Sequence, residues 1–173
     1  MKTLKYTILL VLLVGLTSCE KTHIDETENP NVKTFIKLLK SSQYDSLTLP
    51  EFTYKDIAGL LKYRNEDQLI TNFPHNPVSS YWQSECQLGV YVLWTIESIR
   101  AVSINSQYLI MGFPSQNPIL ARRDANELSL VFDDESHAIA AEAYYDWWES
   151  HKNKDFDDFK NIDPLEKTDY RWH

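Results

Sequence analysis

The hydrophobic positions of this chain recur mostly at helical spacing. Apolar residues fall three or four positions apart between Val32 and about Ser41, directly after Asn31, a residue type that caps helices. A second helix is predicted from Thr53, where Asp56 follows three positions later as a weak capping box. A long helix is predicted from Asp133, because it carries acidic residues in its first turn and basic residues in its last.

The longest apolar segment predicts a buried central helix. It covers about residues 79–104, contains no proline, and spreads its apolar side chains over more than one face. A helix that is apolar nearly all round is buried, so other helices must surround it. The chain has only four glycines, which argues against a turn-rich sandwich or barrel. We therefore expect a mainly α fold, a single helical domain over residues 32–173, with a helical-hairpin or repeat-like arrangement as one option.

Three further segments are read less directly from the pattern. Asn117-Pro118 predicts a short helical turn through Arg123, whereas residues 128–132 fit either a strand or an apolar loop. The tail from Phe156 to Trp172 is rich in aromatic residues, so we expect it to fold back over the helices.

The first nineteen residues resemble the leader of a bacterial lipoprotein. Lys2 and Lys5 precede a short apolar run that is too short to span a bilayer. The sequence Leu16-Thr17-Ser18-Cys19 resembles a lipobox, in which cleavage before the cysteine leaves a thiol that carries a lipid. This resemblance implies a signal peptide over residues 1–18, a lipidated Cys19, and a polar tether up to residue 31. Two or three acyl chains would give lasting attachment to a membrane.

The expected location is the bacterial cell envelope, with a lipid anchor in a membrane. Glutamate rather than aspartate follows Cys19, which does not indicate retention at the inner membrane, so the outer membrane is favoured. The tether of residues 20–31 would reach at most about 40 Å.

The charge balance excludes nucleic acid as a partner. The formal net charge is −8, and loss of residues 1–18 removes Lys2 and Lys5 and no acidic residue, which brings it to −10. A phosphate backbone requires a basic face, but the local basic cluster Arg122-Arg123 is flanked by acidic residues.

No catalytic motif or metal-binding spacing is present, so we expect neither a cofactor nor a metal, and an enzyme is the less favoured class. Glu97 and Arg100 stand three positions apart on the central helix, where they share a face and can form a structural ion pair. The alternative makes Glu97 a general acid or base, with Trp94 beside it. Cys86 lies in an apolar segment and is expected to be a buried structural thiol.

Aromatic residues are abundant, with five Trp, ten Tyr and seven Phe. Most are expected to pack in the core. Trp94, Trp147 and Trp148 are the candidates for an exposed platform that binds a sugar ring or a partner protein.

Several segments together resemble a family of short Bacteroidetes-type lipoproteins of unknown function. They are Asn76-Pro77-Val78-Ser79-Ser80, the run Gly89–Arg100, the pair Trp147-Trp148, and the ending with Pro164-Leu165, Thr168, Tyr170 and Trp172. The resemblance covers most of the chain after the tether. It implies lipidation and a mainly helical domain, and it transfers no catalytic residue.

Three hypotheses for function follow from the sequence. The first is a lipid-anchored, non-catalytic module that binds an envelope protein or a glycan. The second is a hydrolase that uses Glu97 in a cleft, and the third is an immunity or inhibitor lipoprotein that acts through its acidic surface. A pocket at Glu97 would favour the second, and a flat aromatic or acidic patch would favour binding.

Overall fold

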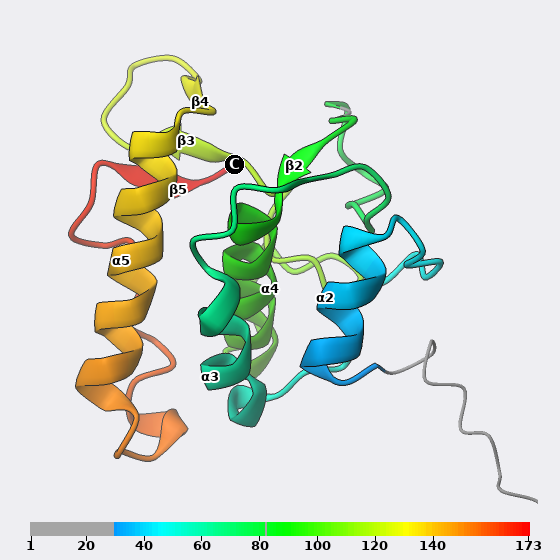
Figure 1. The fold of residues 1–173 in the computed structure, drawn as a ribbon. Coiled ribbons are helices and arrows are strands. Elements are labelled where there is room, and N and C mark those ends of the chain that lie inside the picture. Colours follow the sequence, from blue (N-terminus) through cyan, green and yellow to red (C-terminus); the bar gives the residue numbers. More distant parts are fainter. Residues whose placement is uncertain (1–29, 82) are drawn as a thin grey trace, which may run out of the picture.

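Helix α4, Leu88–Ser103, stands at the centre of the fold in the computed structural model (Figure 1). The structure describes residues 30–81 and 83–173. Twelve of the sixteen residues of α4 are buried, which confirms the predicted burial of a central helix. The helix begins at Leu88 rather than near residue 79, because Cys86 and Gln87 form a strand instead.

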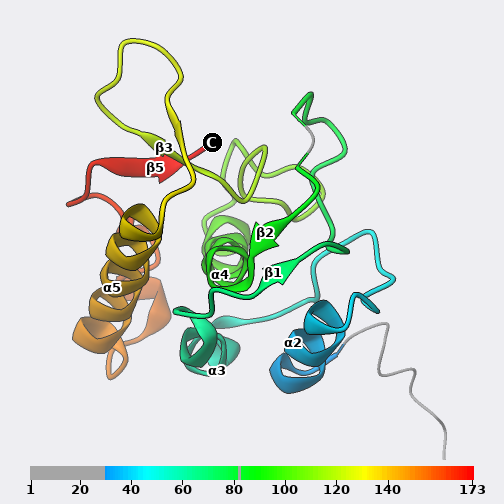
Figure 2. The same ribbon diagram turned by 45° about the horizontal axis from the view of Figure 1, so that its top comes forward.

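Two helices flank α4, and both begin where the sequence predicts. They are α2, Val32–Lys40, and α5, Asp134–His151. The side chain of Asn31 caps the first, and that of Asp133 caps the second; each accepts from a backbone N–H three residues on, at 3.0 and 2.7 Å. Both views place α4 between these two helices (Figures 1 and 2).

The predicted second helix is present as three short turns. A 3-10 turn, η1 (Tyr54–Asp56), leads into α3 (Ile57–Leu60) and then into η2 (Leu61–Tyr63). The capping box formed by Thr53 and Asp56 is confirmed, with the Thr53 N–H donating to the Asp56 carboxylate at 2.8 Å.

Two small antiparallel sheets correct the mainly helical prediction. Strand β1 (Leu69–Ile70) pairs with β2 (Cys86–Gln87). In the second sheet, β3 (Leu120–Arg122) lies between β4 (Leu130–Val131) and β5 (Tyr170–Trp172), as Figure 2 shows in part. The prediction of a mainly α, hairpin or repeat-like fold is wrong: the domain mixes helices and sheets. The predicted helical turn over residues 117–123 is also wrong, because β3 occupies part of that segment.

The reason for this error is the length of the strands. Each has two or three residues. An alternating pattern of apolar and polar positions needs at least four residues to be recognised, so strands this short carry no signal of their own. They form because segments distant in sequence come to lie side by side over the helices.

The aromatic tail folds back over the helices, as predicted. A 3-10 turn, η3 (Phe156–Asp158), follows α5, and Phe159, Leu165 and Tyr170 are buried beyond it. One hydrophobic core extends from Phe35 on α2 to Tyr170 on β5. The described helices and the tail therefore share this core.

No helix within the described residues is both long and apolar enough to cross a membrane. The predicted signal peptide, Cys19 and most of the predicted tether lie outside the described residues. Their role is taken up below as a proposal.

Candidate functional site

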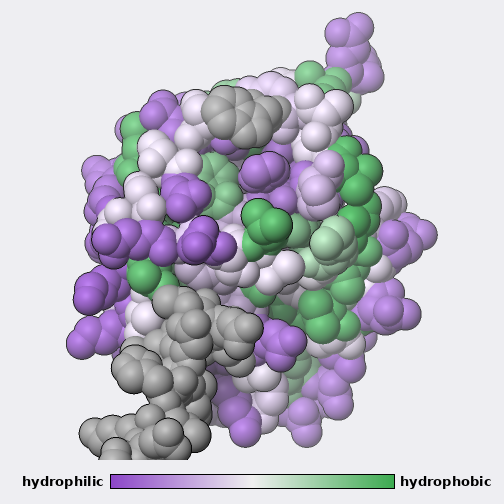
Figure 3. All heavy atoms as spheres, turned by 90° about the vertical axis from the view of Figure 1, so that its right-hand side faces the viewer, coloured by the Kyte–Doolittle hydropathy of each residue, from purple (hydrophilic) through white to green (hydrophobic). Residues whose placement is uncertain are grey.

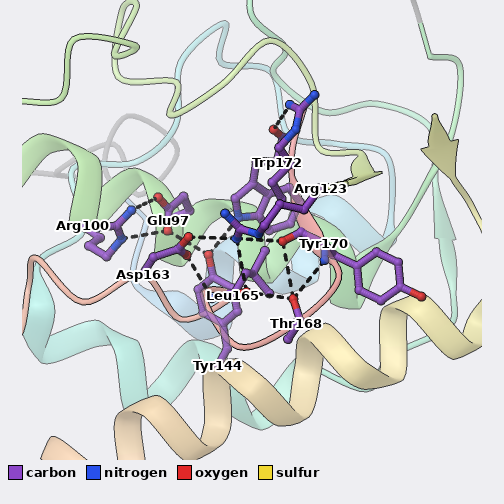
Figure 4. A network of polar contacts seen from close by, with 10 residues as sticks. Glu97, Arg100, Arg123, Tyr144, Asp163, Leu165, Thr168, Tyr170 and Trp172 are labelled. Atoms are coloured by element: carbon purple, nitrogen blue, oxygen red, sulfur yellow. Dashed lines mark hydrogen bonds and ion pairs between the residues drawn. The ribbon is translucent and has the colours of Figure 1, made fainter. Parts of the chain in front are cut away.

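Glu97 and Arg100 form a bidentate ion pair in the interior, which confirms the pairing expected from their spacing (Figure 4). Arg100 Nη2 donates to Oε1 of Glu97 at 2.5 Å, and Nε donates to Oε2 at 3.0 Å. The side chain of Arg100 is only 12% exposed and that of Glu97 only 9%. Arg100 Nη1 also donates to the carbonyl of Lys160 at 3.2 Å, so the pair is tied to the tail.

Tyr144 connects this ion pair to the last strand. Its hydroxyl donates to Oε2 of Glu97 at 2.8 Å and accepts from Nε1 of Trp172 at 2.8 Å. Tyr144 lies on α5 and its side chain is fully buried. One chain of hydrogen bonds therefore joins α4, α5 and β5.

Burial dominates the proton equilibria of this network. Desolvation raises the pKa of Glu97, and the hydrogen bonds and charge of Arg100 oppose that effect. Desolvation together with the nearby Glu97 charge raises the pKa of Tyr144 well above its ordinary value, so its hydroxyl stays a donor at neutral pH.

A hollow of about 670 Å³ opens beside the ion pair. Its charged lining consists of three arginines and two carboxylates: Arg100, Arg123, Arg171, Glu97 and Asp163. Its volume falls within the range of about 300–1,000 Å³ that is typical of small-molecule sites.

The three arginines of the hollow differ in their hydrogen-bond and ion-pair partners. Arg100 is bound to Glu97. Arg123 Nη2 donates to Asp163 at 3.2 Å and to the carbonyls of Leu165 and Tyr170 at 3.2 and 2.9 Å, so it holds the tail in place. Arg171 donates only to the carbonyl of Trp172 at 3.2 Å, and within the described residues no carboxylate lies within 4 Å of it.

Uncharged polar and aromatic groups complete the lining. Asn76, Gln107 and Gln116 contribute planar amides, and Tyr108 and Trp172 contribute rings. The Tyr108 side chain is 68% exposed. The hollow thus combines many hydrogen-bond donors with aromatic surface.

His173 also lines the hollow. Burial and the charge of Arg171 lower the pKa of its imidazole, so the ring is neutral at pH 7 and can both donate and accept a hydrogen bond. Its backbone pairs with residues 117 and 119, which extends the contact between β5 and the segment before β3.

Ser115 forms part of the wall of the hollow and is held from the core. Nε1 of Trp94 donates to its Oγ at 2.8 Å, and Nδ2 of Asn76 donates to its carbonyl at 3.1 Å. The Trp94 ring itself is fully buried and stacks on Phe113 at 5.4 Å. Trp94 therefore supports the site from beneath and does not face it.

The two adjacent tryptophans of α5 lie at another place. Trp147 is 5% exposed and packs on Phe159, with ring centroids 5.2 Å apart. Its Nε1 is buried and has no hydrogen-bond partner among the described residues, and Trp147 lines a second hollow of about 690 Å³. Trp148 is partly buried against the same core. A binding role for this pair stays a prediction.

Cys86 and the histidines give no reactive cluster. The Cys86 thiol is buried, as expected, and its burial raises its pKa strongly. His137 is also buried, and its Nε2 lies 2.7 Å from the carbonyl of Arg64. Among the described residues, no group of three or more His, Cys, Asp or Glu side chains is placed to hold a metal ion.

Sequence reasoning identified the centre of this site but not its surroundings. The three-residue spacing of Glu97 and Arg100 was sufficient to predict their contact. Tyr144 and Trp172 are far from Glu97 in the sequence, so no spacing rule connects them. The hollow depends on loops, and no periodic pattern of apolar and polar residues predicts where loops lie. The single available clue was the alternation Tyr170-Arg171-Trp172, which is typical of a strand with a polar outer face.

Comparison with known proteins gives one match. A family model described as a domain of unknown function, DUF4943, matches residues 26–173. Neither a curated protein nor a solved structure matches the chain. The finer likeness to Bacteroidetes-type lipoproteins stays a prediction. The matched segment includes every residue of the ion pair, the hollow and the core, and the chain therefore belongs to the DUF4943 family of domains of unknown function.

Proposed function

We propose that this protein is a lipid-anchored component of the bacterial cell envelope whose domain binds a carboxylate-bearing glycan in the hollow beside Glu97, without catalysis. The observation that carries the proposal is the lining of the hollow. Arg171, which has no carboxylate partner among the described residues, lies there with planar amides and the rings of Tyr108 and Trp172.

The chemistry of these groups supports a glycan with acidic sugars. Guanidinium groups bind carboxylates through parallel N–H donors, and amide side chains both donate to and accept from ring hydroxyls. Aromatic rings offer apolar surface for the C–H face of a sugar. The side chains that line the hollow include three arginines and two carboxylates, so one positive charge is left over although the whole chain has a formal net charge of −8.

The geometry of Glu97 argues against the hydrolase alternative. Both of its carboxylate oxygens accept charge-assisted or hydroxyl hydrogen bonds, from Arg100 and Tyr144. A general acid or base must reach the proton it transfers, and a carboxylate held by three donors has little capacity left for a substrate. Glu97 serves instead to hold Arg100, which lines the hollow, and Tyr144, which is fully buried.

The sequence supports the anchor. A basic start, an apolar run and the Leu-Thr-Ser-Cys motif precede a polar segment, and the matched family domain begins only at residue 26. Mass spectrometry of the protein purified from bacterial membranes should find Cys19 as the acylated amino terminus. An intact leader, or an unmodified thiol on the mature chain, would contradict the anchor.

The binding proposal is tested by titrating the protein with uronic-acid oligosaccharides and with neutral oligosaccharides of the same length. We expect binding of the acidic series only. Arg171→Gln should weaken it about tenfold or more, because a charge-assisted contact contributes about 1.5–3 kcal/mol. Arg122→Gln is the matched control: it makes the same change at the neighbouring position on the sheet, and Arg122 does not line the hollow. Equal affinity for both glycan series, or equal losses in both variants, would overturn the proposal.

A further inference from the structure

The outer side of α2 carries a row of lysines. Lys33, Lys37 and Lys40 are spaced four and three positions apart, so they lie along one side of the helix. Three other residues of this helix, Phe35, Ile36 and Leu39, are buried in the core. No acidic residue occurs within α2.

The first two of these lysines have no carboxylate partner. Lys40 pairs with Glu66 at 2.7 Å, but within the described residues no carboxylate lies within 4 Å of Lys33 or Lys37. Both residues are exposed. The three lysines line a broad, open hollow of about 700 Å³ together with Tyr63 and Ile36. In a chain with 25 acidic and 17 basic residues, such a group of cations is unusual.

Helix α2, which carries the lysines, is close in sequence to the proposed lipid anchor. The helix is the first described element, and Pro30, buried at its start, fixes where the preceding segment joins the domain. The ten residues between Cys19 and Pro30 would reach at most about 40 Å. A lipid at Cys19 would therefore hold the start of α2 within this distance of the membrane.

The chemistry of this side favours contact with headgroups over insertion. Figure 3 views the molecule from the side on which α2 lies, where hydrophilic and hydrophobic areas adjoin. Lysines close to an anionic bilayer surface are attracted to it by a field that decays within one Debye length, about 8 Å at physiological ionic strength.

We propose that the lysine face of α2, formed by Lys33, Lys37 and Lys40, lies against the anionic headgroups of the membrane that holds the protein. This inference rests on the proposed lipid anchor, because the net charge of the domain as a whole opposes free binding to an anionic surface. The anchor supplies proximity, and the lysine face then determines which side of the domain meets the bilayer.

The test compares lysine reactivity in the intact acylated protein. The protein is reconstituted into vesicles of phosphatidylcholine alone or of phosphatidylcholine with phosphatidylglycerol, and a water-soluble amine reagent is added. We expect Lys33 and Lys37 to be modified several-fold more slowly on the anionic vesicles. Lys154 and Lys167, which are exposed and lie after α5, are internal controls whose rates should not differ between the two vesicles. The protection should decline as salt is added.

Two results would overturn the inference. One is equal rates at Lys33 and Lys37 on both kinds of vesicle, and the other is equal protection of all four lysines. Flotation of the protein with the vesicles is recorded in the same samples and reports the anchor separately. A protein that floats without selective protection would retain its anchor and lack the proposed orientation, whereas a protein that fails to float would refute the anchor and the orientation together.

Discussion

At the scale of single residues, Tyr144 is the group on which the site depends most. Its hydroxyl both donates to Glu97 and accepts from Trp172, so it uses both functions of the group in a fully buried position. Removing one partner from a buried hydrogen bond costs more than the bond contributed, because the remaining group is left desolvated and unpaired. Sequence spacing predicted the contact of Glu97 with Arg100 but could not reveal Tyr144, which is 47 positions away from Glu97.

Tyr144→Phe is therefore expected to lower the free energy of unfolding by about 1–3 kcal/mol, since it leaves the Trp172 N–H without its acceptor. Urea denaturation monitored by circular dichroism measures the change. Tyr145→Phe is the control, because Tyr145 is 38% exposed and its ring, which lies 4.2 Å from the Arg64 guanidinium, is retained. Similar stability of the two variants would contradict the role assigned to Tyr144.

At the scale of elements, the helices were predictable where their ends carry capping chemistry. Asn31 and Asp133 mark the starts of α2 and α5 in the sequence, and both caps are present in the structure. The start of α4 was misplaced, because its N-cap Gln87 makes no side-chain hydrogen bond that caps the helix, and Cys86 and Gln87 pair with β1 instead. The segment 128–132, for which the sequence allowed a strand or a loop, contains β4. The pairing of the strands was not predictable, because it is decided by tertiary packing.

The cap of α5 gives a prediction with a pH dependence. Asp133→Ala should cost about 1 kcal/mol in the free energy of unfolding at pH 7, whereas Asp133→Asn should cost less, because asparagine also caps. The hydrogen bond from the Ser136 N–H lowers the pKa of Asp133 below 3.8. A lowered pKa adds stability above the unfolded value and loses it as the pH falls through the folded value. The difference between wild type and Asp133→Asn should thus begin to shrink as the pH falls below about 3.8, and it should vanish only once the pH has passed the lower pKa of the folded state. Urea denaturation across this range would show it.

Gly89 determines how closely α4 approaches its neighbours. A Cβ atom at this position would lie 2.4 Å from His137 Nε2 and 2.5 Å from the Arg64 carbonyl oxygen. Gly89→Ala should therefore destabilise the domain by about 1–3 kcal/mol through overpacking. The matched change Gly59→Ala, in α3, would place its Cβ in ordinary contact with Val32 at 3.5 Å.

This second substitution should be neutral or stabilising by up to about 1 kcal/mol, since alanine favours the helical conformation. Thermal denaturation measures both effects: the melting temperature should fall in Gly89→Ala and should stay the same or rise in Gly59→Ala. A stabilising effect of Gly89→Ala would mean that α4 and His137 are not in close contact.

At the scale of the whole molecule, one core joins the beginning and the end of the described chain. Phe35 on α2 and Tyr170 on β5 belong to the same hydrophobic cluster. Helix α4 lies between α2 and the sheet that contains β5 (Figure 1). Aromatic composition predicted that the tail would return to the core, but not that it would form the edge of a sheet. The hollow exists only because the tail closes over α4.

We therefore expect a single cooperative unfolding transition. Tryptophan fluorescence, which reports mainly on the helices and the tail, and far-ultraviolet circular dichroism should give the same urea midpoint. Separate midpoints would show that the tail with β5 unfolds independently of α4.

The hydrogen bond between the Trp94 indole and Ser115 has a practical consequence. The Trp94 indole is fully buried, and its N–H donates to the Oγ of Ser115 in the wall of the hollow. A molecule that displaces Ser115 would alter the polarity around a fluorophore that solvent quenchers cannot reach. The domain thus contains its own optical sensor for occupancy, and candidate glycans can be screened without any label.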